Sequence, residues 1–208
     1  MLLLVVMLMP LTMIVEGTGI NVNIPTHNYM VGDTVNATLI CTPTTWIKAF
    51  EMKVLFSKSK LQCNQVIEGG FFKPKQTFFN YVINNTNGEI KDVYDLIVGQ
   101  GNVTSTKPIF YVMFQAKAYG RAYINLSGVG ITNETKYLTG LIVSNTTFYI
   151  YSPYDLNYDQ TIGLPDILMV AGSYHQSGSP GWIHMDIDKN GIITLIDLIL
   201  VAFHWGNY

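Results

Sequence analysis

Oxygen-bearing side chains recur with a fixed spacing near the C-terminal end of the chain. Asp155, Asn157, Asp159 and Asp166 occupy positions 1, 3, 5 and 12 of a twelve-residue stretch, and position 7 is Thr161. Carboxylate and amide oxygens, joined by the backbone carbonyl of position 7, are the hard ligands that Ca²⁺ prefers. The stretch therefore predicts a calcium-binding loop.

A second stretch repeats this pattern 31 residues further on (186 − 155), with Asp186, Asp188, Asn190, Ile192 and Asp197 at the same positions. One acidic loop alone is readily explained as a solvated turn. Two loops in the same register argue against that explanation, because the spacing would have to arise twice by accident. The chain is therefore predicted to bind two calcium ions.

An apolar helix is predicted directly after each loop, because apolar residues recur there at positions i, i+3, i+4 and i+7. The residues are Leu164, Ile167, Leu168, Ala171 and Tyr174 after the first loop, and Leu195, Leu198, Ile199, Ala202 and Phe203 after the second. No amphipathic helix precedes either loop, and position 12 is Asp, whereas an EF-hand has helices on both sides and usually Glu at position 12. Position 6 is Gln160 in the first loop and Gly191 in the second, so we expect a weaker first site.

This duplicated loop and helix resembles a dockerin, the calcium-dependent docking module of cellulosome-type assemblies, over residues 152–208. The resemblance implies that calcium orders the loops, that the helices pack antiparallel and that positions 10, 11, 17 and 18 contact a cohesin. Those positions are Leu164, Pro165, Ala171, Gly172, Leu195, Ile196, Ala202 and Phe203. All are apolar or glycine, so these residues are equally consistent with the module's own core.

Charge is unevenly distributed along the 208 residues, which are 49% hydrophobic, 12% charged and of net charge −2. From Asp155 onward six Asp and one Lys give −5, and the eight acidic and eleven basic residues before it give +3. The composition is not that of a disordered chain. The basic residues form no cluster, which argues against nucleic acid as a partner.

Residues 20–151 are predicted to form a series of β-strands, separated by turns rich in Gly and Asn. The predicted strands are 20–24, 34–41, 47–56, 78–83, 109–118, 120–126 and 141–151. Short strands with period-two alternation predict a mainly β fold, a β-sandwich.

The sandwich segment resembles a cohesin, the jelly-roll partner of dockerins. The residues that carry the resemblance are Val31–Val35, Ile47–Val54, Leu61, the Gly69–Gly70 turn, Ile109–Ala118, and Gly120 with Ala122–Leu126. These motifs are less specific than the calcium loops, and carbohydrate-binding modules give similar patterns.

Several features indicate an exported protein, either secreted or at the cell surface. Residues 1–19 read as a signal peptide or an N-terminal apolar anchor, although no Lys or Arg precedes Lys48. Six Asn-x-Ser/Thr sequences are candidate glycosylation sites, at Asn36, Asn84, Asn102, Asn125, Asn133 and Asn145. In an oxidising compartment Cys41 and Cys63 are predicted to form a disulfide, the alternative being two buried thiols.

No catalytic constellation is found, so we predict a non-catalytic adaptor that binds calcium and assembles cohesin-bearing or dockerin-bearing proteins, with self-association as one arrangement. The His residues lack zinc-ligand spacing, and there is no Gly-x-Ser-x-Gly sequence. One alternative is a carbohydrate-binding sandwich that recognises a polysaccharide through a row of exposed aromatic residues, with Tyr111, Tyr119, Tyr123 and Tyr137 as candidates. Another is a cell-surface structural protein stiffened by calcium.

Overall fold

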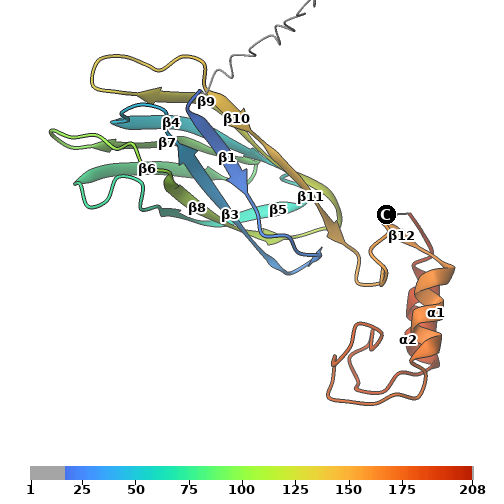
Figure 1. Ribbon diagram of the computed structural model, residues 1–208. Helices are drawn as coiled ribbons and strands as arrows, with labels where there is room; N and C mark the ends of the chain where they lie inside the picture. The colour runs from blue at the N-terminus through green and yellow to red at the C-terminus, as the bar shows by residue number, and fades with distance from the viewer. Residues whose placement is uncertain (1–16, 208) are drawn as a thin grey trace, which may run out of the picture.

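The computed structural model describes residues 17–207, which form a β-sandwich and a smaller C-terminal tail (Figure 1). The sandwich strands are β1 (Gly19–Asn23), β2 (Tyr29–Met30), β3 (Thr34–Thr42), β4 (Ala49–Phe56), β5 (Leu61–Glu68), β6 (Thr77–Asn84), β7 (Glu89–Ile97), β8 (Lys107–Ala116), β9 (Gly120–Thr132), β10 (Ile142–Ser144) and β11 (Thr146–Tyr151). The tail contains β12 (Thr161–Ile162), α1 (Leu164–Gly172), α2 (Leu195–Phe203) and β13 (Gly206–Asn207).

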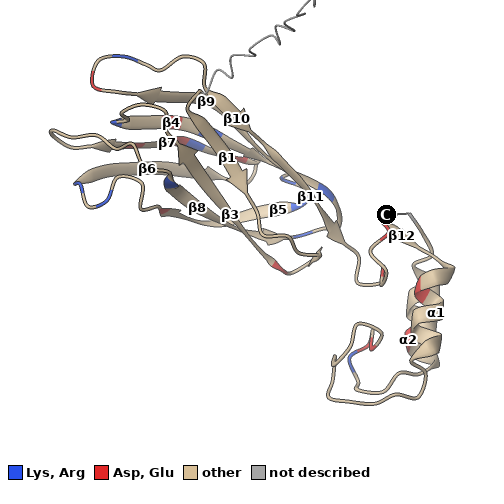
Figure 2. Ribbon diagram, in the orientation of Figure 1, with Lys and Arg blue, Asp and Glu red and all other residues tan. Residues whose placement is uncertain are grey.

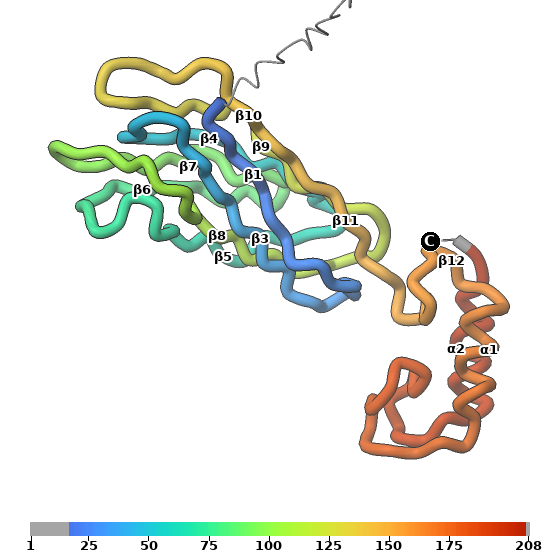
Figure 3. Tube along the Cα trace, in the orientation of Figure 1, coloured from blue at the N-terminus to red at the C-terminus, as the bar shows by residue number. Residues whose placement is uncertain are grey.

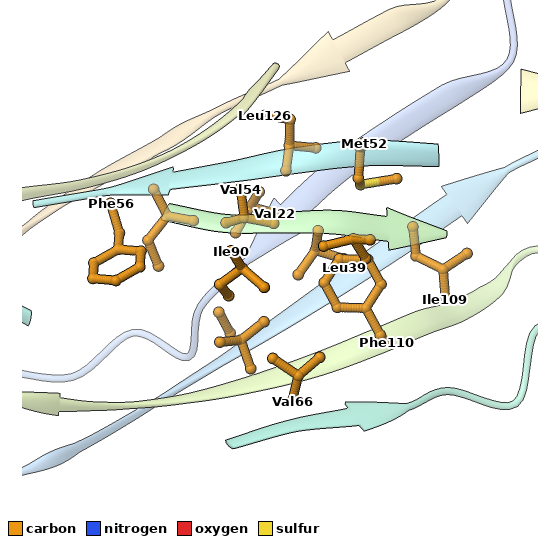
Figure 4. Packing of buried hydrophobic residues seen from close by; sticks show 14 of the residues in the cluster. Val22, Leu39, Met52, Val54, Phe56, Val66, Ile90, Ile109, Phe110 and Leu126 are labelled. Carbon is orange, nitrogen blue, oxygen red and sulfur yellow. The ribbon is translucent and has the colours of Figure 1, made fainter. Parts of the chain in front are cut away.

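The sandwich consists of two sheets packed face to face. Sheet A has the order β10-β1-β3-β8-β5, and sheet B has the order β2-β11-β9-β4-β7-β6. Neighbouring strands are antiparallel except for the pairs β1–β10 and β2–β11. Alternate residues of both sheets fill the space between them, including Leu39, Val54, Ile90 and Phe110, all fully buried (Figure 4). The predicted β-sandwich is confirmed.

Two long strands, β5 at the edge of sheet A and β7 inside sheet B, were not predicted because neither keeps a simple alternation. Pairing of β5 with β8 shifts register between Cys63 and Gln65, which places two exposed residues in succession. In β7 the backbone of Asp92 has φ 52°, and the register shifts against both neighbouring strands nearby. A bulge of this kind moves later side chains to the other face and removes the period-two signal.

The predicted disulfide between Cys41 and Cys63 is wrong, because both are free, buried thiols. The residues lie on β3 and β5, which are separated in sheet A by β8. Cys41 is level with Lys107 of β8 and Cys63 with Phe114, so they lie at different heights along the sheet as well. A disulfide needs Cα atoms within about 7 Å, and two strand spacings already exceed this distance.

The tail folds around its two helices, which run antiparallel side by side (Figure 3). Its own core consists of Leu156, Ile162, Val170, Ile193 and Val201. The short strands β12 and β13 pair antiparallel and bring the first loop beside the end of the chain. The two predicted helices are therefore present, although the small β-ladder makes the tail not purely helical.

The apolar segment predicted as a signal peptide or anchor lies largely outside the described residues, since the description begins at Gly17. Within residues 17–207, neither helix is long enough to cross a membrane.

Candidate metal centre and docking faces

The first acidic loop is organised by hydrogen bonds from its own backbone to its terminal carboxylates. Asp155 accepts from the N–H groups of Asp159 (3.1 Å) and Gln160 (2.9 Å). Asp166 accepts from the N–H groups of Leu156 (2.7 Å) and Gly163 (2.8 Å). Gly163 is the N-cap residue of α1, so the second of these bonds also caps the helix. The chain therefore wraps around both carboxylates, which come from opposite ends of the loop.

The second loop repeats this network position by position. Asp186 accepts from the N–H groups of Asn190 (3.1 Å) and Gly191 (3.0 Å). Asp197 accepts from the N–H groups of Ile187 and Thr194, both at 2.8 Å. Equivalent bonds in the two loops differ by about 0.1 Å, so the duplication seen in the sequence extends to the folded backbone.

The terminal carboxylates of both loops are buried: Asp155 and Asp186 are 1% and 2% exposed, and Asp166 and Asp197 are 0% exposed. In the second loop, carboxylate oxygens of Asp186, Asp188 and Asp197 all lie within 4.8 Å of one another. Anions so close together repel one another, and the two buried ones, Asp186 and Asp197, also lose hydration, which N–H donors alone compensate only in part. The donor set is all oxygen, so these residues fit a hard divalent cation such as Ca²⁺.

The remaining predicted ligands line the exposed side of each loop. Asn157 donates its amide to Asp159 (2.8 Å), and Asn190 donates its amide to Asp188 (2.7 Å), so positions 3 and 5 lie together in both loops. At position 7 the N–H groups of Thr161 and Ile192 each donate to the side chain at position 5, at 2.8 Å. The structure thus joins the predicted ligands of both loops through one hydrogen-bond pattern, and it gathers three carboxylates within 4.8 Å in the second loop.

Backbone conformation is shared by the two loops at the positions where it is most demanding. Position 4 has φ 60° at Tyr158 and 56° at Lys189, and position 6 has φ 71° at Gln160 and 90° at Gly191. Only glycine adopts this left-handed region without cost. The expected strain at Gln160 is therefore present in the structure.

The eight predicted partner-contact residues are all exposed, so the alternative that they fill the module's own core is wrong. Leu164 is 56% exposed, Leu195 58%, Ile196 54% and Phe203 85%. Val170 and Val201, which face the other side of α1 and α2, provide the core instead. The helices therefore present an uncovered apolar surface, which we call the helix face, made of Leu164, Pro165, Leu168, Ala171, Gly172, Leu195, Ile196, Ile199, Ala202 and Phe203.

A second apolar surface lies on the outer side of sheet B and was not predicted. Pairing across β6, β7 and β4 places Phe78 beside Leu96 and Leu96 beside Ala49, and Phe78 stacks on Tyr94 with 6.0 Å between ring centroids. Phe78 is 54% and Leu96 is 37% exposed. We call these four residues the sheet strip. The sequence did contain a signal for it, since apolar residues stand on both faces of the segment 93–98, Val93 and Ile97 on one and Tyr94, Leu96 and Val98 on the other.

A shallow pocket adjoins the sheet strip and is closed on one side by the β9–β10 connection. Ala49, Glu51, Tyr94, Leu96, Thr132 and Tyr137 are among the residues that line it. The Tyr137 hydroxyl donates to Glu51 at 2.9 Å, which holds this connection over the sheet. The outer side of sheet B therefore combines apolar side chains with a hollow, a surface suited to a protruding partner.

The candidate glycan-binding tyrosines do not form a row. Tyr111 lies on β8 of sheet A and Tyr123 on β9 of sheet B, whereas Tyr119 and Tyr137 lie in connections. The feature that would favour a carbohydrate-binding sandwich is thus absent among these four residues. The six candidate glycosylation residues are all accessible to some degree, with Asn36 and Asn145 exposed and the others half-buried.

Comparison with known proteins identifies the sandwich. The family model described as the cohesin domain matches residues 20–148, and the chain therefore belongs to the cohesin family. A comparison with curated proteins gives no match. The matched segment ends before the tail.

Solved cohesin structures show the same fold at low sequence identity. The non-cellulosomal cohesin from the hyperthermophilic archaeon Archaeoglobus fulgidus aligns with a TM-score of 0.54 and 16% identity, covering 66% of this chain and 93% of that one. A chain of a type I cohesin–dockerin complex from Clostridium thermocellum gives 0.56 and 14%, covering 65% and 94%. A type II cohesin module from an adaptor scaffoldin of Acetivibrio cellulolyticus gives 0.56 and 10%, covering 64% and 91%.

Proposed function

We propose that this chain is a non-catalytic, exported adaptor that carries two halves of a calcium-dependent protein-docking system. The sandwich is the cohesin that receives a dockerin, and the tail is a dockerin-like calcium module that docks on a cohesin. The observation that carries the proposal is the duplication of the buried carboxylate network beside helices whose apolar residues remain exposed.

Calcium has a structural role in this proposal. Bound Ca²⁺ supplies the positive charge that offsets repulsion among the carboxylates. The first loop would hold one ion through Asp155, Asn157, Asp159, Thr161 and Asp166. The second loop would hold another through Asp186, Asp188, Asn190, Ile192 and Asp197. Asp166 and Asp197 are the third residues of α1 and α2, and each also accepts from its N-cap N–H. The same carboxylates therefore join the loop to the helix, so the order of the loops fixes the helix face.

The sandwich half of the proposal rests on the family and on the sheet strip. Comparison structures include cohesins solved together with dockerins in type I complexes. In this chain the exposed apolar residues and the hollow on sheet B provide a surface of suitable chemistry. Export is supported by the six glycosylation sequences and by the extracellular abundance of calcium.

Calcium titration of the full chain by calorimetry, with far-UV circular dichroism, tests the tail. We expect two ions per chain and a gain in helix, and Asp166→Asn and Asp197→Asn should each remove one ion while retaining side-chain volume. Asp92→Asn, at an exposed sandwich carboxylate, is the matched control and should bind two. Absence of binding at millimolar calcium would disprove the calcium module.

Immobilised type I and type II dockerins, loaded with calcium, test the sandwich. Capture that is weakened by Leu96→Asp but not by Ile67→Asp would support the sheet strip as the docking surface. These two residues are similarly exposed, 37% and 41%, and lie on opposite sheets. Equal effects of both changes, with the fold intact, would contradict the assignment.

A further inference from the structure

The helix face of the tail carries no charge that could recognise a polar partner. The charged residues of α1 and α2 are Asp166 and Asp197, and both are buried among their loops. What remains exposed is apolar, with Leu168 at 58%, Ile199 at 49% and Phe203 at 85%. Exposed large apolar side chains in this number are typical of protein interfaces.

The sandwich of the same chain does not cover this face. A cleft where tail and sandwich meet is lined by Met30, Val31 and Asp33 on one side and by Gly181, Ile183 and His184 on the other. None of the residues that line this cleft belongs to α1 or α2. The tail therefore meets its own sandwich through residues 181–189, which include the start of the second loop, and no helix residue lines this contact.

Two contacts inside the tail and one contact with the sandwich support that orientation. The N–H of Gly181 donates to Asp186 at 2.7 Å, which ties the connector to the second loop. His184 shares a hydrogen bond of 2.7 Å with the hydroxyl of Tyr158, and Tyr158 packs edge-on against Tyr151, the last residue of β11. The tail is thus fixed to the end of the sandwich from which it emerges.

The sheet strip lies at the opposite end of sheet B. Ala49 pairs with Thr132 at the end of β9, whereas the strand that leads to the tail pairs its Ile150 with Gly120 at the start of β9. The twelve residue-to-residue steps from Gly120 to Thr132 correspond to roughly 40 Å of strand. The join of residues 152–154 spans at most about 14 Å when extended, so it is too short to lay the helix face on the strip of its own chain.

We propose that the partner of each tail is the sheet strip of a second copy of this chain, so that copies join head to tail. Charge favours this pairing over tail with tail or sandwich with sandwich, because residues 155–208 carry −5 and the residues before them carry +3. Figure 2 shows where the acidic and basic residues of the described chain lie. Two bound Ca²⁺ ions leave the tail at −1 (−5 + 4), still opposite in sign to the sandwich. A head-to-tail contact is heterologous and grows into open chains unless its rotation closes a ring.

Sedimentation of the full chain over a range of concentrations tests the inference, which rests on the proposed function. In calcium we expect mass to rise with concentration, and excess chelator should return it to the monomer. Phe203→Asp blocks the helix face and Leu96→Asp blocks the sheet strip, so each variant alone should stay monomeric. Ile67→Asp, on sheet A, is the control and should assemble like the wild type.

Mixing the two blocked variants gives the decisive result. Each variant keeps the surface that the other lacks, so an equimolar mixture should form 1:1 dimers and no longer species. A Leu96→Asp variant that still dimerises alone would indicate a symmetric tail contact and overturn the inference. A wild type that binds two calcium ions yet stays monomeric would also overturn it while leaving the adaptor function intact, whereas failure to bind calcium would overturn the adaptor function itself.

Discussion

The ring of Tyr154 stacks on the ring of His204, with 3.6 Å between centroids and 12° between ring planes. Tyr154 precedes Asp155, the first residue of the first acidic loop, and His204 caps the end of α2, so the stack joins the beginning of the tail to its last helix. Nδ1 of His204 donates to the carbonyl of Leu200 at 2.8 Å, which fixes the orientation of the imidazole ring. The stack and the β12–β13 ladder close the tail at the same place.

Replacing His204 with Ala should loosen this closure without removing a calcium ligand. We expect the calcium-loaded tail to lose about 1 kcal/mol, the usual contribution of an aromatic pair beyond its buried area. Thermal unfolding of the full chain in excess calcium measures the change, with His175→Ala as control because His175 is exposed and its ring packs on its neighbour Tyr174. An equal loss in both variants would argue against a specific role for the stack.

Replacing Gln160 with Gly should strengthen the first calcium loop. Relief of the left-handed strain at φ 71° is expected to stabilise the loop by about 1 kcal/mol, which corresponds to roughly fivefold tighter binding at that site. Calorimetric titration of the full chain, with the second site removed by Asp197→Asn, measures the affinity directly. An unchanged or weaker first site would show that the strain does not limit binding.

Gly191→Ala, which adds a side chain at the equivalent position of the second loop, should lower the calcium affinity of that loop. The loss should be larger than the gain that Gln160→Gly gives the first loop. A Cβ at Gly191 would lie 2.7 Å from the carbonyl oxygen of Gly178, in addition to the strain at φ 90°. The Asp166→Asn background isolates this site in the same titration. Wild-type calcium affinity in this variant would mean that the backbone at Gly178 moves away at little cost.

The buried carboxyl of Asp95 should make the sandwich less stable as pH rises. Burial, with a smaller effect of the Glu68 charge, raises the pKa of Asp95 to about 7 from 3.8, and Oδ1 has no hydrogen-bond partner within the described structure. Because the folded state binds this proton more tightly than the unfolded state, the stabilisation is complete below about pH 4 and is lost as pH rises to about 7. A shift of three units corresponds to about 4 kcal/mol at most.

Asp95→Asn should therefore abolish most of this dependence and raise the stability of the sandwich at pH 8. Urea unfolding at pH 5 and pH 8 in saturating calcium compares the variant with the wild type. Asp92→Asn is the control, because Asp92 lies on the same strand but is exposed. Parallel pH profiles for wild type and Asp95→Asn would contradict the assignment.

The cysteines should behave as inert thiols. Burial raises the pKa of both Cys41 and Cys63 to about 12, so the reactive thiolate is scarce at neutral pH. We expect no change in unfolding temperature on adding a reducing agent, and thiol titration with Ellman's reagent only after denaturation. Oxidised, crosslinked protein that resists unfolding more than reduced protein would contradict the free thiols.

The two acidic loops could be predicted residue by residue because the oxygen-bearing side chains of each come from one short segment, whereas their binding of calcium stays a prediction. The sheet strip could not be predicted, because Phe78, Leu96 and Ala49 become neighbours only through pairing of three strands. The disulfide prediction failed for the same reason, since sequence separation says nothing of the strand β8 that lies between Cys41 and Cys63. The bulge at Asp92 concealed a strand whose inner residues are otherwise regular.

The continuity of β11 with the first calcium loop has a mechanical consequence. β11 is hydrogen-bonded to β9 over the pairs from Thr146 to Ile150 and also lies beside β2, and it leads into the loop within four residues. Tension applied through the tail therefore acts along the strand axis, where the hydrogen bonds on both sides share the load and must break together. Sheet B would resist this force because its strands would have to shear past one another. The two ends of the tail lie side by side, so the tail would unfold before the sandwich.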